Sequence, residues 1–175
     1  MLKKLFFVTA ILYLAFHTQV SAQRPVVRAK AATSAGDVEF VQTGNNYSGT
    51  GAAEWQVKLK GKVLGKLSEP YDAIKIVKVI KDFEGKENVV IFLGEMTGSA
   101  CASTYNLLAV RADGESYITE PIYNCAAPKL AQTSDKITLY FPRSPVMQGT
   151  GFVPAETWIY QNGKLRQQKS TKRGR

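Results

Sequence analysis

Short segments that alternate apolar and polar residues, each ended by a turn signal, constrain this chain more than any other feature. In residues 55–59, Trp55, Val57 and Leu59 fall on one side of an extended chain, which is the period of a half-buried strand. Asp113-Gly114 and Asn162-Gly163 are typical hairpin turns, because glycine adopts positive φ at little cost. Such segments occupy residues 38–43, 55–59, 73–83, 88–93, 103–111, 115–122, 136–141 and 157–161. They predict an all-β fold, a small sandwich or barrel of about eight short antiparallel strands.

Two of these segments need separate arguments. Residues 73–83 (AIKIVKVIKDF) partly fit a helical period, but their isoleucine and valine content favours a strand, because branched Cβ atoms suit a pleated surface. Residues 88–93 form a continuous apolar run, which is typical of a central strand.

The first 22 residues have the composition of a cleaved secretory leader. Lys3 and Lys4 precede an apolar run from Leu5 to Phe16, and Val20-Ser21-Ala22 supplies a cleavage site. Twelve apolar residues at about 1.5 Å each are too short to span the roughly 30 Å hydrocarbon core of a membrane. We therefore expect a periplasmic or secreted protein that begins at Gln23 and is not an integral membrane protein.

The remaining chain divides into three parts by composition. Residues 23–36 are small, polar and aperiodic, which predicts a flexible N-terminal arm. Residues 37–166 carry the strand signals and are expected to form a single β domain. Residues 167–175 predict a basic, disordered tail.

Positive charge is concentrated at the C-terminal end. The formal charge is +9 for the whole chain and +7 once Lys3 and Lys4 leave with the leader. Six cations and no acid follow Gly163, which leaves residues 23–163 at +1. Such a tail either keeps a chain end solvated or attracts an anionic surface, such as phospholipid head groups, lipopolysaccharide phosphates or an acidic protein. Nucleic acid is not an expected partner of an exported protein. The candidate contact residues are Lys164, Arg166, Lys169, Lys172, Arg173 and Arg175.

The two cysteines that follow the leader, Cys101 and Cys125, predict a disulfide, which is the default outside the cytoplasm. If residues 112–114 form a three-residue turn, Arg111 faces Glu115 and the same register sets one cysteine opposite the other. A two-residue turn would offset the cysteines by one place and still leave them close. The three-residue register also pairs Leu108 with Ile118 and Tyr105 with Pro121.

A resemblance accompanies this hairpin. The pattern resembles a disulfide-closed β-hairpin of small, uncharacterised exported bacterial proteins over about thirty residues, from Gly98 to Cys125. Because the shared motif is structural, the resemblance implies no catalytic residue. The residues that carry it are Gly98-Ser99-Ala100-Cys101, Tyr105, Leu108, Val110, Asp113-Gly114 and Asn124-Cys125.

Few residues point to catalysis. The single histidine, His17, leaves with the leader, which excludes histidine-based triads and histidine-ligated metals. The sequence contains no phosphate-binding loop, dinucleotide fingerprint or nucleophile elbow, so neither a cofactor nor a metal is expected. Two carboxylates at a suitable separation are enough for a glycosidase, and candidates for such a pair are present. They are Glu54, Glu69, Asp72, Glu95, Glu120 and Glu156.

The segment beside Cys101 is a candidate recognition loop, with Glu95, Thr97 and Ser99 as its polar groups, although an ordinary connection fits the same composition. Together these features predict an exported, non-enzymatic binding protein of the bacterial envelope, of the inhibitor, immunity or surface-binding type. Its expected partner is an envelope protein or an anionic envelope surface. The alternative is a carboxylate-dependent hydrolase of cell-wall or glycan material.

Overall fold

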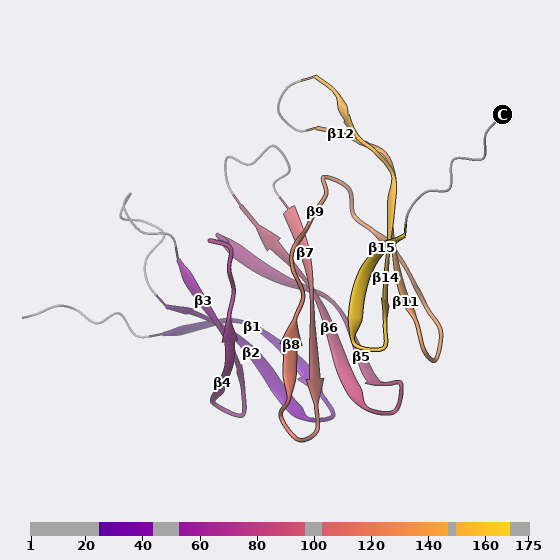
Figure 1. The fold of residues 1–175 in the computed structure, drawn as a ribbon. Helices are drawn as coiled ribbons and strands as arrows, with labels where there is room; N and C mark the ends of the chain where they lie inside the picture. The colour runs from indigo at the N-terminus through magenta and orange to yellow at the C-terminus, as the bar shows by residue number, and fades with distance from the viewer. Residues whose placement is uncertain (1–24, 44–52, 97–102, 147–149, 169–175) are drawn as a thin grey trace, which may run out of the picture.

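A computed structural model describes residues 25–43, 53–96, 103–146 and 150–168 of the chain. Within these ranges all regular structure is β, so the predicted all-β class is confirmed. Fifteen strands form four antiparallel sheets (Figure 1). No helix among the described residues has the length and apolarity needed to cross a membrane.

The strands follow the chain in three groups. The first sheet pairs β1 (Val26–Thr33), β2 (Gly36–Thr43), β3 (Glu54–Leu59) and β4 (Lys62–Lys66) in that order. The central sheet pairs β5 (Ala73–Phe83), β6 (Glu87–Glu95), β7 (Ser103–Arg111) and β8 (Ser116–Ile118), with β9 (Ile122–Tyr123) also on β7. The C-terminal sheet has the order β10 (Lys129–Gln132), β11 (Ile137–Phe141), β14 (Glu156–Gln161) and β15 (Lys164–Gln168). A short ribbon pairs β12 (Ser144–Pro145) with β13 (Phe152–Val153).

The central sheet is buried on both faces. Side chains alternate across a strand, so Val90 and Phe92 of β6 pack into a core shared with the first sheet. Val89 and Ile91 face the other way, into a second core shared with the C-terminal sheet. The apolar run at 88–93 is therefore a central strand, as predicted, and three sheets pack side by side (Figure 1).

Hydrogen bonds join the three sheets at the end where the hairpin turns lie. Ser34, between β1 and β2, bonds through its Oγ to Asp82 Oδ1 at 2.8 Å on β5. On the other side, the backbone N–H of Asn162 donates to Glu84 Oε1 at 3.0 Å. Asp82 and Glu84 both have positive φ, which is costly for residues with a Cβ. The β5–β6 turn thus holds strained backbone where it contacts both neighbouring sheets.

The expected flexible arm at residues 23–36 is wrong, because β1 occupies most of it. β1 pairs with β2 along its length and lies beside β5. Its inward positions are small, and Ala31 is 2% exposed in the first core. Backbone pairing and close packing of alanine therefore order a segment with little apolar bulk, and the β fold begins at Val26 rather than at residue 37.

The structure also corrects the strand count and the start of the tail. Apart from β1, the additional strands are short, from two to five residues in β4, β10, β12, β13 and β15. Such strands have too few residues for a clear alternation. β15 continues to Gln168, paired with β14, so residues 167 and 168 belong to the sheet rather than to a tail.

The hairpin register is confirmed near the turn and wrong further along. Leu108 faces Ile118, and Arg111 N donates to Glu115 O at 2.9 Å across a turn that ends in Gly114 at φ +88°. Tyr105, however, faces Ile122 rather than Pro121. Proline has no N–H to donate, so the ladder breaks there and resumes one place later.

Cys125 is disulfide-bonded rather than a free thiol. Cys101, the other cysteine of the sequence, lies outside the described residues. The structure therefore does not show the pairing itself, and the Cys101–Cys125 bridge stays a prediction.

Candidate functional site

The C-terminal sheet has one face in the core and the other in solvent. Leu139 and Phe141 of β11 and Leu165 of β15 point inward to the second core. The opposite side, which we call the cationic face, consists of the outward positions of the four strands. These are Lys129, Ala131, Thr138, Tyr140, Thr157, Ile159, Gln161, Lys164, Arg166 and Gln168.

The outward strand positions of this face contain three cations and no carboxylate. Lys129 lies on one edge strand, and Lys164 and Arg166 lie on the other. Within the described residues none of the three forms an ion pair. Asp135 of the β10–β11 turn adjoins this face, since its Oδ2 accepts from Gln161 Nε2 at 2.9 Å. The face therefore has an excess of positive charge.

Three lysines of the first and central sheets are neutralised by acids, and the other lysines of these sheets form no ion pair within the described residues. Lys30 pairs with Glu39 at 2.6 Å, and the side-chain hydrogen bond to Glu39 raises the pKa of Lys30 above its ordinary value. Lys66 lies 3.2 Å from Glu54. The predicted contact residues Lys164 and Arg166 likewise form no ion pair within the described residues, so an external anion can contact them.

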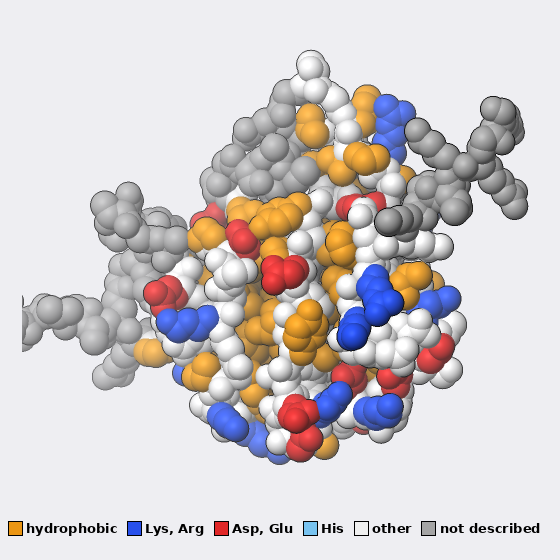
Figure 2. All heavy atoms as spheres, in the orientation of Figure 1, with side chains coloured by type: hydrophobic (Ala, Val, Ile, Leu, Met, Phe, Trp, Pro, Cys, Tyr) orange, Lys and Arg blue, Asp and Glu red, His pale blue; other side chains and the backbone are white. Residues whose placement is uncertain are grey.

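A shallow groove runs along the β14–β15 edge of the cationic face. Its volume is about 270 Å³, and both Lys164 and Arg166 line it. Tyr140, in the middle of the face, is 41% exposed. Figure 2 shows lysine and arginine side chains gathered over the β14–β15 hairpin. The other groove residues are Ile159, Gln161, Asn162, Gln167 and Gln168.

The four remaining candidate cations, Lys169, Lys172, Arg173 and Arg175, lie outside the described residues. In the sequence they follow Gln168, the last residue of β15. The expected pairing across Asn162-Gly163 is confirmed, since Lys164 faces Gln161 and Leu165 faces Tyr160.

The predicted recognition loop is not assembled by the described residues. Glu95 ends β6 and its Oε1 lies 2.5 Å from Lys75 Nζ, so its carboxylate is engaged by a neighbouring strand. Thr97 and Ser99 lie outside the described residues. Recognition by these three residues stays a prediction.

Several of the carboxylates considered for catalysis have structural partners. Glu156 accepts hydrogen bonds from Asn124 Nδ2 and Gln167 Nε2, both at 2.7 Å. Glu69 bonds the Tyr123 hydroxyl, and this bond is the main cause that raises the pKa of Tyr123 to about 12. These contacts orient side chains rather than leave an acid facing a cleft.

An acid that the sequence analysis did not select, Glu87, lines a cavity of about 150 Å³. The cavity lies between the β7–β8 and β14–β15 hairpins, and Arg111, Glu115 and Tyr117 line it as well. Tyr160 donates its hydroxyl to Glu87 Oε1 at 2.5 Å. Burial first, and then the bond and charge of Glu87, raise the pKa of Tyr160, so this phenol stays protonated as the donor. The remaining lining residues are Ala109, Ser116 and Gly163.

One sequence signal could have revealed Glu87. It immediately precedes the apolar run of β6, and the β6–β7 register sets it opposite Arg111, a pair of opposite charges at neighbouring strand ends. A charged residue that opens a doubly buried strand needs a partner, because burial of an unpaired carboxylate is costly. The partner Tyr160 is 73 positions away and follows from the tertiary fold alone.

Comparisons with known proteins return no match. No protein-family model matches the chain, and neither a curated protein nor a solved structure does.

Proposed function

We propose that this chain is an exported, non-enzymatic binding protein of the bacterial envelope, and that its cationic face contacts a phosphate-bearing lipid surface. The observation that supports this most is the set of three unpaired cations on a solvated sheet face. Each lysine or arginine near an anionic membrane contributes roughly 1 kcal/mol of attraction. The basic residues that follow Gln168 would add to the same attraction.

The shape of the cationic face favours a lipid surface over an envelope protein as the partner. Its cations lie on both edge strands, with Tyr140 between them, so charge is spread across the sheet. Tyrosine is favoured at the head-group level of membranes, where its ring is apolar and its hydroxyl is solvated. The groove beside Lys164 is lined mostly by polar and charged side chains, unlike the apolar pocket of a typical protein hot spot.

The proposal includes export and a Cys101–Cys125 bridge. The leader at residues 1–22 would direct the chain out of the cytoplasm, where disulfides persist. Near the cysteines, Thr104 faces Tyr123 and Tyr105 faces Ile122. This register is shifted by one residue from the register at the turn. A shift of one residue still leaves Cys101 and Cys125 close to each other. The bridge would close the β7–β9 hairpin at its open end.

A second candidate function, a carboxylate-dependent hydrolase of cell-wall or glycan material, has one observation in its favour. Glu87 and Glu115 line the same cavity. Against it, Arg111 Nη1 lies 2.6 Å from Glu115 Oε2 and Tyr160 donates its hydroxyl to Glu87 Oε1, so both carboxylates already have partners within the protein. Release of reducing sugars from purified cell-wall glycan, abolished by Glu87→Gln, would support this function over the binding protein.

Vesicle co-sedimentation tests the lipid contact. The Lys164→Gln/Arg166→Gln variant removes two charges from the cationic face, and Lys62→Gln/Lys78→Gln removes two exposed charges from β4 and β5 as a matched control. At low salt we expect the first variant to bind anionic vesicles about 30-fold more weakly than the parent, the equivalent of two lost cation contacts. The control should lose less than about threefold. Equal losses in the two variants would show that net charge, and not the cationic face, governs binding.

A further inference from the structure

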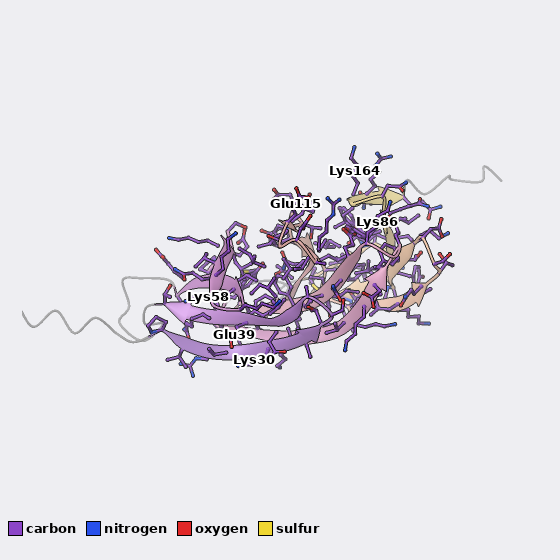
Figure 3. The ribbon with its side chains drawn as sticks, turned by 90° about the horizontal axis from the view of Figure 1, so that it is seen from below. Lys30, Glu39, Lys58, Lys86, Glu115 and Lys164 are labelled. Atoms are coloured by element: carbon purple, nitrogen blue, oxygen red, sulfur yellow. The ribbon has the colours of Figure 1, made fainter. Side chains whose placement is uncertain are left out.

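The cavity lined by Glu87 lies at the turn end of the molecule and has walls from two sheets. Glu115 of the β7–β8 hairpin and Lys164 of the β14–β15 hairpin lie on the same side, whereas Lys30 and Glu39 lie on the opposite side (Figure 3). The volume of about 150 Å³ equals that of about five water molecules in the liquid. It is smaller than the roughly 300–1,000 Å³ of sites for whole small molecules, so it suits a single functional group.

The Glu87 carboxylate has acceptor capacity left on the cavity side. Its side chain is 7% exposed, and Oε1 accepts the Tyr160 hydroxyl. Oε2 forms an ion pair with Arg111, whose Nε lies 3.9 Å away, which is longer than a hydrogen bond. A carboxylate offers about four lone-pair sites, and a buried one gains most from additional donors. Because Glu87 lines the cavity, a donor group there would have this carboxylate as an acceptor.

The charge and the rim of the cavity favour a cationic donor. Glu87 and Glu115 outnumber Arg111, so the lining has a formal charge of −1. Arg111 is already paired with Glu115 at 2.6 Å. Tyr117 is 50% exposed beside them, and the face of a tyrosine ring attracts a cation. Glycine at position 163 leaves open space, since no atom lies within 4 Å of where a Cβ would be.

We propose that this cavity binds the ammonium group of a lysine side chain presented by a partner protein or peptide. The ammonium donates to Glu87 Oε2, and its methylenes lie against Tyr117. A lysine head group carries three donors and a compact charge, which suits a narrow site with one buried carboxylate. The lining residues of this site are distinct from the outward positions that define the cationic face, although Gly163 adjoins Lys164.

NMR titration with Nα-acetyl-lysine-N-methylamide tests this site on the protein exported with its own leader. We expect saturable shifts of the amides of Ser116, Tyr117 and Gly163, and none with the norleucine analogue, which has the same chain without the charge. Glu87→Gln keeps an acceptor for Tyr160 but removes the charge, and we expect it to weaken binding at least about tenfold. The matched control Glu39→Gln, on the opposite side, should change the affinity less than about twofold.

Arg111→Gln separates a cation site from other ligand classes by the sign of its effect. Since this change makes the lining more negative, it should strengthen lysine binding, whereas a site for an anion or a sugar would lose a donor and weaken. Tyr117→Ala should weaken binding by about two- to fivefold through the lost ring contact. Equal shifts with the norleucine analogue, or weaker lysine binding in Arg111→Gln with unchanged thermal unfolding, would overturn the proposal. If Glu87→Gln unfolds, the Arg111 and Tyr117 variants still decide it.

Discussion

Replacement of Gly94 by alanine tests how tightly the central sheet packs against the segment before β5. Gly94 lies on β6, and a Cβ added there would lie 2.6 Å from Tyr71 Cζ and closer still to Cδ1 and Cε1. The ring cannot easily move away. Tyr71 is 1% exposed, Asn106 Nδ2 donates to its hydroxyl at 3.0 Å, and its carbonyl accepts from Trp55 Nε1 at 2.6 Å.

The expected cost of Gly94→Ala follows from these contacts. Overpacking of a rigid core costs about 1–3 kcal/mol. Displacement of the ring also breaks the Asn106 bond, at about 1 kcal/mol. Alanine restricts the unfolded chain more than glycine does and returns about 0.4–1 kcal/mol. We therefore expect a net loss of about 1–3.5 kcal/mol in the free energy of unfolding.

Urea denaturation, followed by tryptophan fluorescence, measures this loss. Gly65→Ala is the matched control, because its added Cβ would meet only Ile118 Cδ1 at 3.4 Å, an ordinary contact. We expect that variant to stay within about 0.5 kcal/mol of the parent. In a Tyr71→Ala background, Gly94→Ala should cost little, because the clashing ring is absent. If Gly94→Ala and Gly65→Ala were equally stable, the packing of Tyr71 on β6 would be refuted.

Three further predictions concern titration, the cysteines and the tail. Because folding raises the pKa of Tyr160, the stabilisation that its neutral phenol provides is complete below the ordinary pKa of about 10 and declines at higher pH. Tyr160→Phe should therefore lower the free energy of unfolding at neutral pH by about 1–3 kcal/mol and make its decline at alkaline pH less steep. An unchanged alkaline decline would contradict this. Replacement of Cys101 and Cys125 by alanine should lower the free energy of unfolding by about 2–4 kcal/mol without loss of the β circular-dichroism signal, and two free thiols in the exported protein by mass mapping would refute the bridge. Truncation after Gln168 should leave Tm unchanged and weaken binding to anionic vesicles, and equal binding at low salt would leave the tail no role in lipid contact.

The parts of the fold that follow from the sequence are those where local pattern and tertiary packing agree. β5 spans Ala73–Phe83 as predicted, because its branched residues pack into both cores. β1 was not predictable in this way, since its inward residues are small and its order comes from pairing with β2. The sequence shows that Pro121 has no N–H to donate, so a break in the strand pairing there could be predicted. The direction in which the register shifts could not.

The candidate site residues also differ in whether the sequence alone could identify them. Lys164 and Arg166 could be selected from a run of charge, because surface charge is a local property of the sequence. For Glu87 the sequence offers only its place before the apolar run of β6, because its partner Tyr160 comes from a different sheet. The grouping of Lys129 with Lys164 and Arg166 likewise depends on the strand order of the C-terminal sheet, which places sequence-distant residues on one face.

Lysine acetylation in the presence and absence of anionic vesicles, read out by mass spectrometry, tests the proposed lipid contact most directly. If the cationic face contacts the lipid surface, Lys129 and Lys164 become protected, while exposed lysines of the other sheets, such as Lys62 and Lys78, keep the rate that they have in solution. High salt should remove the protection, because exposed charges are screened within about 10 Å or less. Protection of Lys62 and Lys78 with no change at Lys129 and Lys164 would contradict the proposal, since it would place the lipid on a different face of the molecule.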